Sequence, residues 1–291
     1  MGEALHTDCH QHLWPEPLID ALRSRGYLRG WTLHLPGEPP FEVCPDDHDV
    51  ARRADDPAER VLLSLSSPLG LEYLPESHEF SDIWHASARG LGEPFHVWAA
   101  ASVVEPDPAG LEKILGADRV VGLQLPATAL ADPAAIERLD PLFDVLKNAG
   151  KPLLVHPGPA PACADDLPSW WPALVPYVAQ LHQAWLAWHL AGRRDLRIGF
   201  VALAGLAPLH HERLAARGGA LGPVDPNVYY ETSSYGTRAI DAMVRVVGVD
   251  GIVHGSDRPY AKPLLDPGLG DAFRHALLSA NPHHFLTGAP R

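Results

Sequence analysis

Short apolar runs rich in β-branched residues recur along the chain and alternate with stretches of helical periodicity. These runs predict eight strands, at residues 5–9, 61–65, 96–101, 120–125, 153–156, 198–203, 228–231 and 252–255. The stretches between them predict helices at residues 17–25, 108–115, 134–147, 172–190, 209–217 and 237–247. Eight strands that alternate with helices are what a closed parallel barrel requires, although a doubly wound open sheet fits the same pattern.

Two regions depart from this alternation. Residues 31–35 and 41–43 flank the turn-forming stretch PGEPP, which predicts a small β-hairpin after the first strand, over one end of the barrel. Residues 156–171 are rich in Pro, Ala and Asp and lack periodicity, as is typical of a lid or binding loop. No linker or repeat divides the chain. We therefore expect residues 1–291 to form one domain, a (β/α)₈ TIM barrel, which typically needs about 250 residues.

The composition of the chain limits the kinds of molecule that it is expected to bind. The 36 acidic and 23 basic residues give a net charge of −13, which disfavours binding to nucleic acid or to a membrane surface. The three cysteines have no CxxC spacing, so neither a disulfide framework nor a cysteine-based zinc site is expected. The chain has no apolar stretch long enough to span a bilayer and no signal-like N-terminus. These features predict a cytoplasmic protein that acts on a small molecule.

Polar residues gather where the predicted strands end. Asp8, His10 and His12 share one face of the first strand, His156 ends the fifth, and Asp257 follows the eighth. The C-terminal ends of barrel strands meet at the face where barrel enzymes place their active sites. A HxH pair alone arises often by chance. The pair His10 and His12, followed along the chain by His156 and Asp257 at strand ends, predicts a site for one divalent metal. Three imidazoles and one carboxylate suit Zn²⁺ first and Mn²⁺ or Fe²⁺ less well.

Four motifs carry a resemblance to a known family: DCHQHLW at the first strand, LLVHPG at the fifth, IVHGSDRPY at the eighth and NPHHFL near the C-terminus. With them the chain resembles the amidohydrolase superfamily, in particular its mononuclear branch of hydrolases, lactonases and non-oxidative decarboxylases. The resemblance covers nearly the whole chain. It implies that His10, His12, His156 and Asp257 are the metal ligands. It also implies that Asp257 hydrogen-bonds a metal-bound water and moves its proton.

The chain departs from the family pattern at two places. Binuclear members carry a bridging lysine or glutamate at the end of the fourth strand, where this chain offers only Gln124, so one metal is expected. Members usually carry a histidine at the end of the sixth strand, where this chain has alanine and glycine. His210 follows a few residues later and either reaches back over the site or lies on an ordinary solvated helix. Arg258 pairs either with a substrate or with an acidic neighbour.

The leading functional hypothesis is a metal-dependent hydrolase that attacks an amide, lactone or similar bond with a metal-activated water. Asp257 would serve as general base and then acid, and His210 or Arg258 would stabilise the oxyanion. The first alternative is a metal-dependent non-oxidative decarboxylase of a small carboxylic acid. The second is a barrel without catalysis that binds a ligand or partner, which metal analysis would separate from the others. The sequence leaves the oligomeric state open, with a homodimer as one option.

Overall fold

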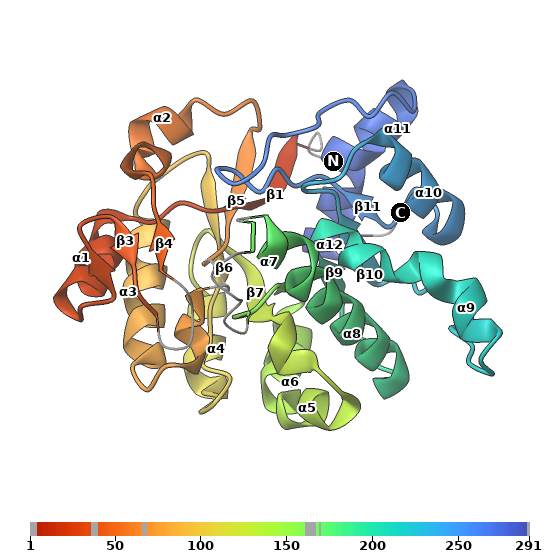
Figure 1. The fold of residues 1–291 in the computed structure, drawn as a ribbon, viewed down its shortest axis with the longest axis horizontal. Coiled ribbons are helices and arrows are strands. Elements are labelled where there is room, and N and C mark those ends of the chain that lie inside the picture. The colour runs from red at the N-terminus through yellow and green to blue at the C-terminus, as the bar shows by residue number, and fades with distance from the viewer. Residues whose placement is uncertain (1–4, 36–39, 66–68, 161–166, 169, 290–291) are drawn as a thin grey trace.

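Eight parallel strands form the centre of the molecule, which is described by a computed structural model over residues 5–35, 40–65, 69–160, 167–168 and 170–289 (Figure 1). Neighbours in the sheet follow the order of the chain. The strands are β1 (Thr7–Gln11), β5 (Arg60–Leu63), β6 (Phe95–Ala99), β7 (Val120–Pro126), β8 (Leu153–His156), β9 (Ile198–Phe200), β10 (Val228–Glu231) and β11 (Ile252–Val253). This order decides between the two folds that the sequence allowed, because an open doubly wound sheet reverses its strand order and this sheet does not.

Backbone contacts between the first and last strands bring the sheet close to a full barrel. The amide of Cys9 in β1 donates to the carbonyl of His254, just past β11, at 2.9 Å. Gln11 and Arg258 form a further parallel bridge. The predicted (β/α)₈ barrel is therefore confirmed, and the loop after β11 runs directly beside the end of β1.

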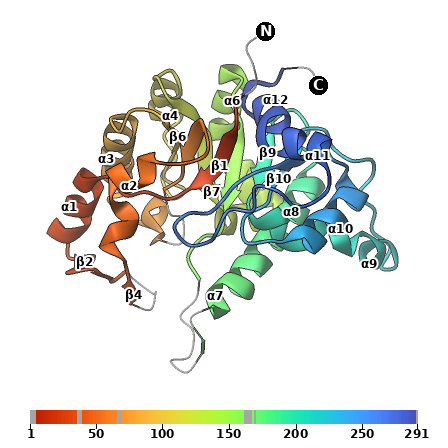
Figure 2. The same cartoon turned by 90° about the horizontal axis from the view of Figure 1, so that it is seen from above.

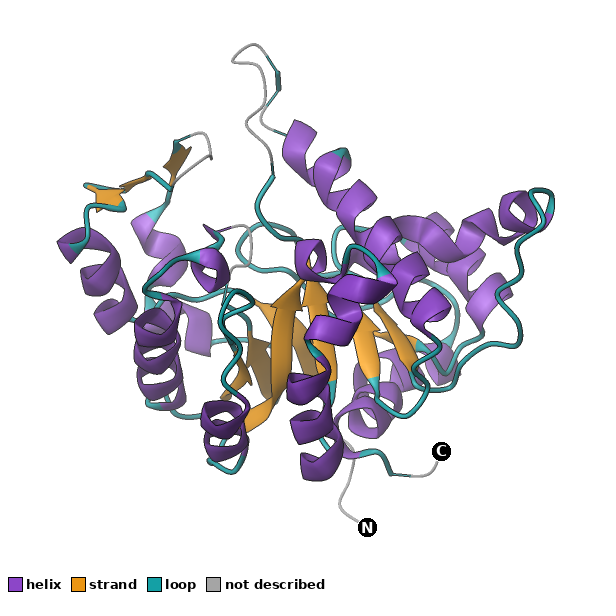
Figure 3. Ribbon diagram, turned by 90° about the horizontal axis from the view of Figure 1, so that it is seen from below, coloured by secondary structure: helices purple, strands orange, loops and turns teal. Residues whose placement is uncertain are grey.

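Helices surround this barrel (Figure 3). They are α1 (Glu16–Ser24), α2 (Val50–Ala54), α3 (Ser77–Arg89), α4 (Pro108–Leu115), α5 (Pro133–Arg138), α6 (Asp140–Ala149), α7 (Trp171–Leu174), α8 (Pro176–Ala191), α9 (His211–Ala215), α10 (Thr237–Val247), α11 (Asp271–His275) and α12 (Asn281–Thr287). In the described part of the chain, none of them is both long and apolar enough to cross a membrane.

Two predicted helices are each divided in the structure, and proline is the reason in both. The stretch 134–147 breaks between α5 and α6 next to Pro141, and the stretch 172–190 breaks between α7 and α8 next to Pro176. Proline lacks the amide hydrogen that a continuous helix needs, and its ring restricts the residue before it. Helix α3 was missed, because its many serine and histidine residues have weak helix propensity.

The predicted hairpin is present and is one strand larger than expected. Strands β2 (Leu28–Arg29), β3 (Thr32–Leu33) and β4 (Phe41–Glu42) pair antiparallel in a separate small sheet. This sheet and α7 lie on the side toward which the barrel strands point (Figures 2 and 3). The insertion after β1 and the segment after β8 therefore flank the C-terminal mouth of the barrel. Part of the predicted loop 156–171 lies outside the described residues.

Candidate metal centre

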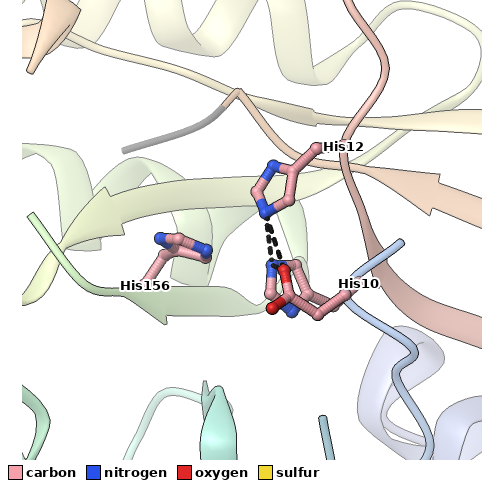
Figure 4. Close-up of side chains that lie close together, drawn as sticks. His10, His12 and His156 are labelled. Atoms are coloured by element: carbon pink, nitrogen blue, oxygen red, sulfur yellow. Dashed lines mark hydrogen bonds and ion pairs between the residues drawn. The ribbon is translucent and has the colours of Figure 1, made fainter. Parts of the chain in front are cut away.

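Three histidines and one aspartate converge at the mouth of the barrel. His10 lies in β1, His12 directly follows it, His156 ends β8, and Asp257 lies in the loop after β11. Each offers one donor atom, and these four atoms lie within 4.8 Å of one another. Nε2 of His12 is 3.0 Å from Nε2 of His10 and 3.2 Å from Oδ1 of Asp257. Figure 4 shows the three imidazoles turned toward a common point.

Backbone hydrogen bonds hold the Asp257 loop against the end of β1. The amide of Asp257 donates to the carbonyl of His10 at 2.9 Å, and the amide of His12 donates to the carbonyl of Arg258 at 2.7 Å. Asp257 itself has a φ of 56°, in the left-handed region that aspartate and asparagine tolerate better than most residues. The backbone therefore aims the Asp257 carboxylate at the histidine pair.

Asp8, which was expected to share the face of His10 and His12, has a different task. One oxygen of its buried carboxylate accepts hydrogen bonds from the amides of Ser256 at 3.0 Å and His10 at 3.1 Å. The other accepts from the side-chain amide of Gln11 at 2.9 Å. Asp8 is not one of the four converging donors. It ties the first strand to the loop after the last one.

Neighbouring acceptors determine which nitrogen of each imidazole carries the hydrogen. Nδ1 of His12 is 3.1 Å from the carbonyl of Ser64, and Nδ1 of His156 is 3.0 Å from the carbonyl of Pro157. A carbonyl only accepts, so both Nδ1 atoms carry the hydrogen. Nδ1 of His10 likewise lies 3.3 Å from the carboxylate of Glu231. With hydrogen on Nδ1, each Nε2 presents a lone pair.

Three converging lone pairs and a carboxylate repel one another unless a cation lies between them. All three imidazoles are nearly inaccessible to solvent, so water does not screen this repulsion. Histidine nitrogens and one carboxylate oxygen are a donor set that divalent transition metals prefer. The residues present therefore fit the divalent metal that the sequence predicted.

The pKa shifts of the three histidines agree with a site for a cation. Burial lowers the pKa of His12, and burial together with the other two imidazoles holds the pKa of His156 well below its usual range. At neutral pH both rings are therefore uncharged. Burial also opposes charge on His10, but the hydrogen bond to Glu231 and the negative charge of Asp257 outweigh it and raise the pKa of His10. The surroundings of His10 thus attract positive charge.

Glu231, the last residue of β10, is a component of the site that sequence reasoning missed. Its side chain is fully buried, and besides His10 it accepts hydrogen bonds from the hydroxyl of Ser233 at 2.7 Å and from the amide of Ala202 at 3.2 Å. A β-carbon at Gly255 would lie 2.2 Å from its Oε1, so only glycine leaves room for it there. The available signal was a carboxylate at the C-terminal end of a predicted strand.

The end of the sixth barrel strand presents no histidine, as the sequence indicated. After β9 the backbone makes a left-handed turn in which the residues from Ala202 to Leu206 all have φ between 47° and 62°. Val201 and Ala202 contribute apolar surface to the cavity above the metal centre. Gln124, which stands where a bridging residue would be, is buried, and its amide donates to Glu72 at 3.2 Å.

Two residues predicted as oxyanion stabilisers lie elsewhere. The ring of His210 packs against His182 at 5.0 Å between centroids and lines a separate cavity. The guanidinium of Arg258 donates to the carboxylate of Asp56 at 2.5 Å. Neither residue is among the described residues that line the cavity above the four donors. The structure therefore gives the expected oxyanion role of His210 and Arg258 no geometric support, because the turn after β9 and the Asp56 pair direct both side chains away.

Comparisons with known proteins show the fold. No family model matches the chain, and no curated protein matches it. The structure of an amidohydrolase II superposes with a TM-score of 0.73 and 16% identity, covering 97% of this chain and 99% of that one. A 5-carboxyvanillate decarboxylase of Novosphingobium aromaticivorans, in complex with manganese and 4-hydroxy-3-methoxy-5-nitrobenzoic acid, superposes with a TM-score of 0.70 and 16% identity, covering 97% of this chain and 96% of that one. A 2,6-dihydroxybenzoate decarboxylase from Rhizobium superposes with a TM-score of 0.68 and 15% identity, covering 98% of this chain and 99% of that one. The chain shares its fold with these proteins over nearly its whole length.

Proposed function

We propose that the chain is a member of the amidohydrolase superfamily that catalyses metal-dependent, non-oxidative decarboxylation of an aromatic carboxylic acid. The observation that carries this proposal is the convergence of His10, His12, His156 and Asp257 at the C-terminal mouth of the barrel. Two of the three similar structures are named as decarboxylases of aromatic acids, and one of them holds manganese together with an aromatic acid. These likenesses favour decarboxylation over the hydrolysis that the sequence alone put first.

The four donors would hold one divalent cation, with manganese and zinc both compatible with nitrogen and oxygen ligands. When bound, the cation supplies Lewis-acid withdrawal of electron density from the substrate's carboxylate and a neighbouring oxygen. The buried imidazoles would position the cation, and the apolar side chains around them restrict the access of water.

Asp257 is the residue of the group best placed to move a proton. Its side chain is 21% exposed, whereas His10 and His12 are 1% exposed, so it exchanges protons with the cavity more readily. When the bond between the ring and the carboxylate breaks, the electron pair stays on the ring carbon and carbon dioxide leaves. The carboxylate of Asp257 takes a proton from water and passes it to that carbon, so that water supplies the proton and the carboxylate is regenerated.

The proposal is tested by incubating the manganese-loaded protein with a panel of ortho-hydroxybenzoic acids in D₂O. Decarboxylation releases carbon dioxide and places one deuterium on the carbon that lost the carboxylate. Asp257→Asn should reduce turnover by at least about a hundredfold, because general acid–base groups contribute about that much, while metal content stays near that of the parent. Asp266→Asn, in the same loop but exposed, is the matched control. Unchanged turnover in Asp257→Asn contradicts the assignment.

Hydrolysis of an amide or lactone bond is the second candidate, because the amidohydrolase II structure superposes at a TM-score of 0.73. In that reaction Asp257 accepts a proton from water and returns it to the leaving group. A parallel panel of esters, lactones and amides in ¹⁸O water separates the two reactions, since only hydrolysis places the label in a product carboxylate. A protein that binds no metal when supplied with zinc or manganese, and turns over neither panel, would instead be a binding protein.

A further inference from the structure

The cavity above the metal centre is large and its walls are apolar. It has a volume of about 660 Å³, and the four candidate ligands are among its lining residues. Much of the wall comes from the small sheet, helices α7 and α8, and the turn after β9, and the residues after β10 add Ser233, Ser234 and Tyr235. Their aliphatic and aromatic side chains in the wall include Leu33, Phe41, Leu174, Val178, Leu181 and Val201.

No lysine or arginine lines this cavity among the described residues. The sequence also has none in the undescribed segments between them, at residues 36–39, 66–68, 161–166 and 169. Two arginines lie near the end of β1, and both have acceptors of their own. Arg53 donates to the carbonyl of His12 at 2.7 Å and to Gln11 at 2.6 Å, and Arg258 donates to Asp56. The metal centre is therefore the place in the cavity where positive charge would reside.

The absence of lysine and arginine from the described cavity wall restricts the charge that a substrate can carry. A carboxylate that leaves water for an apolar wall must be compensated by an opposite charge or by hydrogen bonds. One carboxylate finds that compensation at the metal centre. A second one, projecting toward Leu174 or Val178, would find no cation there, because the described wall apart from the four candidate ligands offers only uncharged polar groups such as the hydroxyls of Tyr177, Ser234 and Tyr235.

The size and the rim of the cavity restrict the shape of the substrate. Cavities of about 300–1,000 Å³ typically hold drug-sized ligands, which are larger than one substituted benzene ring. Phe41, Leu174 and Tyr260 line the cavity and are also large exposed side chains, so the apolar wall continues to the solvent at its mouth. An elongated apolar body would cover this rim.

We propose, resting on the decarboxylase function above, that the substrate is a monocarboxylic aromatic acid with an uncharged apolar body larger than one ring. Its single acid group meets the metal centre, and its body fills the wall from the turn after β9 to the rim formed by Phe41, Leu174 and Tyr260. Dicarboxylic acids are disfavoured because the described wall offers their second carboxylate no cation.

Binding to the manganese-loaded protein, measured by isothermal titration calorimetry, tests this proposal with three probes. Salicylate has one ring and one carboxylate, 5-phenylsalicylate adds an apolar ring, and 5-(4-carboxyphenyl)salicylate adds a second carboxylate to that ring. The apolar ring should tighten binding about tenfold or more, because its burial removes apolar surface from water. The second carboxylate should cancel at least that gain, because it leaves water without a cation to pair with. Equal affinity for salicylate and 5-phenylsalicylate, or for the two biaryl acids, overturns the proposal.

A charge placed on the wall provides an independent check. Leu174→Arg introduces a cation at a position that is 61% exposed and lines the cavity, and Leu190→Arg introduces one at a position that is 70% exposed on α8 and does not line it. Leu174→Arg should tighten the dicarboxylic probe about two- to fivefold, the range of an exposed ion pair. Leu190→Arg should leave all three affinities unchanged. Equal effects of the two variants contradict the proposal.

Carbon dioxide release, followed in parallel, separates this proposal from the decarboxylase function on which it rests. If the probes bind in the expected order and none releases carbon dioxide, the decarboxylase function fails while the charge and shape of the ligand stand. If salicylate is decarboxylated and 5-phenylsalicylate neither binds more tightly nor reacts, the function stands and the larger apolar body is wrong. The order of the three probe affinities on the unmodified protein tests the proposal even if Leu174→Arg folds poorly.

Discussion

The carboxylate of Glu231 lies 3.3 Å from Nδ1 of His10, although 221 positions separate the two residues in the sequence. The pair bridges β10 and β1 at the closing edge of the barrel, with the last strand between them. A carboxylate on the far nitrogen of a metal-binding imidazole fixes its tautomer and makes the near nitrogen a better ligand. Glu231 is thus placed to orient His10 without belonging to the converging donors.

Glu231→Gln should weaken metal binding about 10- to 100-fold, the usual effect of removing an outer partner of a metal-binding histidine. The amide is neutral and nearly the same size, so the side chain still fits beside Gly255. Competition with a fluorescent chelator measures the change. Glu137→Gln, at an exposed position of α5, is the matched control. Parent-like affinity in Glu231→Gln would show that the contact with His10 is only structural.

Metal binding should also stabilise the folded protein. A cation that binds only the folded state adds about 2.7 kcal/mol at a concentration a hundredfold above its dissociation constant, which corresponds to roughly 5 °C in melting temperature for a chain of this size. Differential scanning calorimetry with and without manganese or zinc measures the shift. His156→Gln removes one donor and should lose most of it, whereas His275→Gln, outside the metal centre, should retain it. An equal shift in both variants would place the metal elsewhere.

Acid should destabilise the protein through a histidine remote from the metal centre. His85 in α3 is 7% exposed, and its Nε2 accepts a hydrogen bond from the amide of Ala100 at 3.0 Å, so the ring must be neutral. Burial lowers the pKa of His85 from 6.5 to about 4. The folded state therefore binds this proton less readily than the unfolded state. The stability that the neutral ring provides is complete above pH 6.5 and is lost as the pH falls toward 4.

This pKa difference corresponds to about 3 kcal/mol of unfolding free energy. Urea titrations between pH 7.5 and pH 4.5 should show a loss of that order in the parent. His85→Gln keeps an acceptor for Ala100 and does not titrate, so its pH dependence should be shallower. His78→Gln, exposed on the same helix, is the control. His48 contributes in the same direction, because burial also lowers its pKa to about 4 and its Nδ1 accepts from the amide of Trp14.

The left-handed turn after β9 should depend on Gly205. This residue has a φ of 59°, and a β-carbon on it would lie 2.6 Å from the carbonyl oxygen of Val178 in α8. Gly150 has a similar φ of 62° and open space around the same position. Gly150→Ala should therefore lower the free energy of unfolding by about 1–2 kcal/mol through the backbone conformation alone. Gly205→Ala should cost more, because α8 must also shift; thermal unfolding of both variants tests this, and equal losses would show that Val178 moves freely.

The sequence by itself predicted the eight strands and the four converging side chains, and the strand order in the structure decided for the closed barrel. Apolar runs with turn signals defined the strands, and parallel strands that close into a ring bring their C-terminal ends to one mouth. His10, His12, His156 and Asp257 stand at such ends, so their proximity follows from topology. Their role as metal ligands remains a prediction, as do the single domain and the cytoplasmic location.

The tertiary structure decided what depends on side-chain direction and on contacts between distant segments. Glu231 meets His10 only because the barrel closes, and Arg258 turns to Asp56 only because the loop after β11 runs beside β1. His210 was near in sequence, yet the turn after β9 carries it to another cavity. Among the described residues, the cavity wall contains no lysine or arginine, and this too is invisible in the sequence, which contains 23 such residues. Local pattern specifies secondary structure and strand ends, whereas the charge of a cavity depends on which segments the fold brings together.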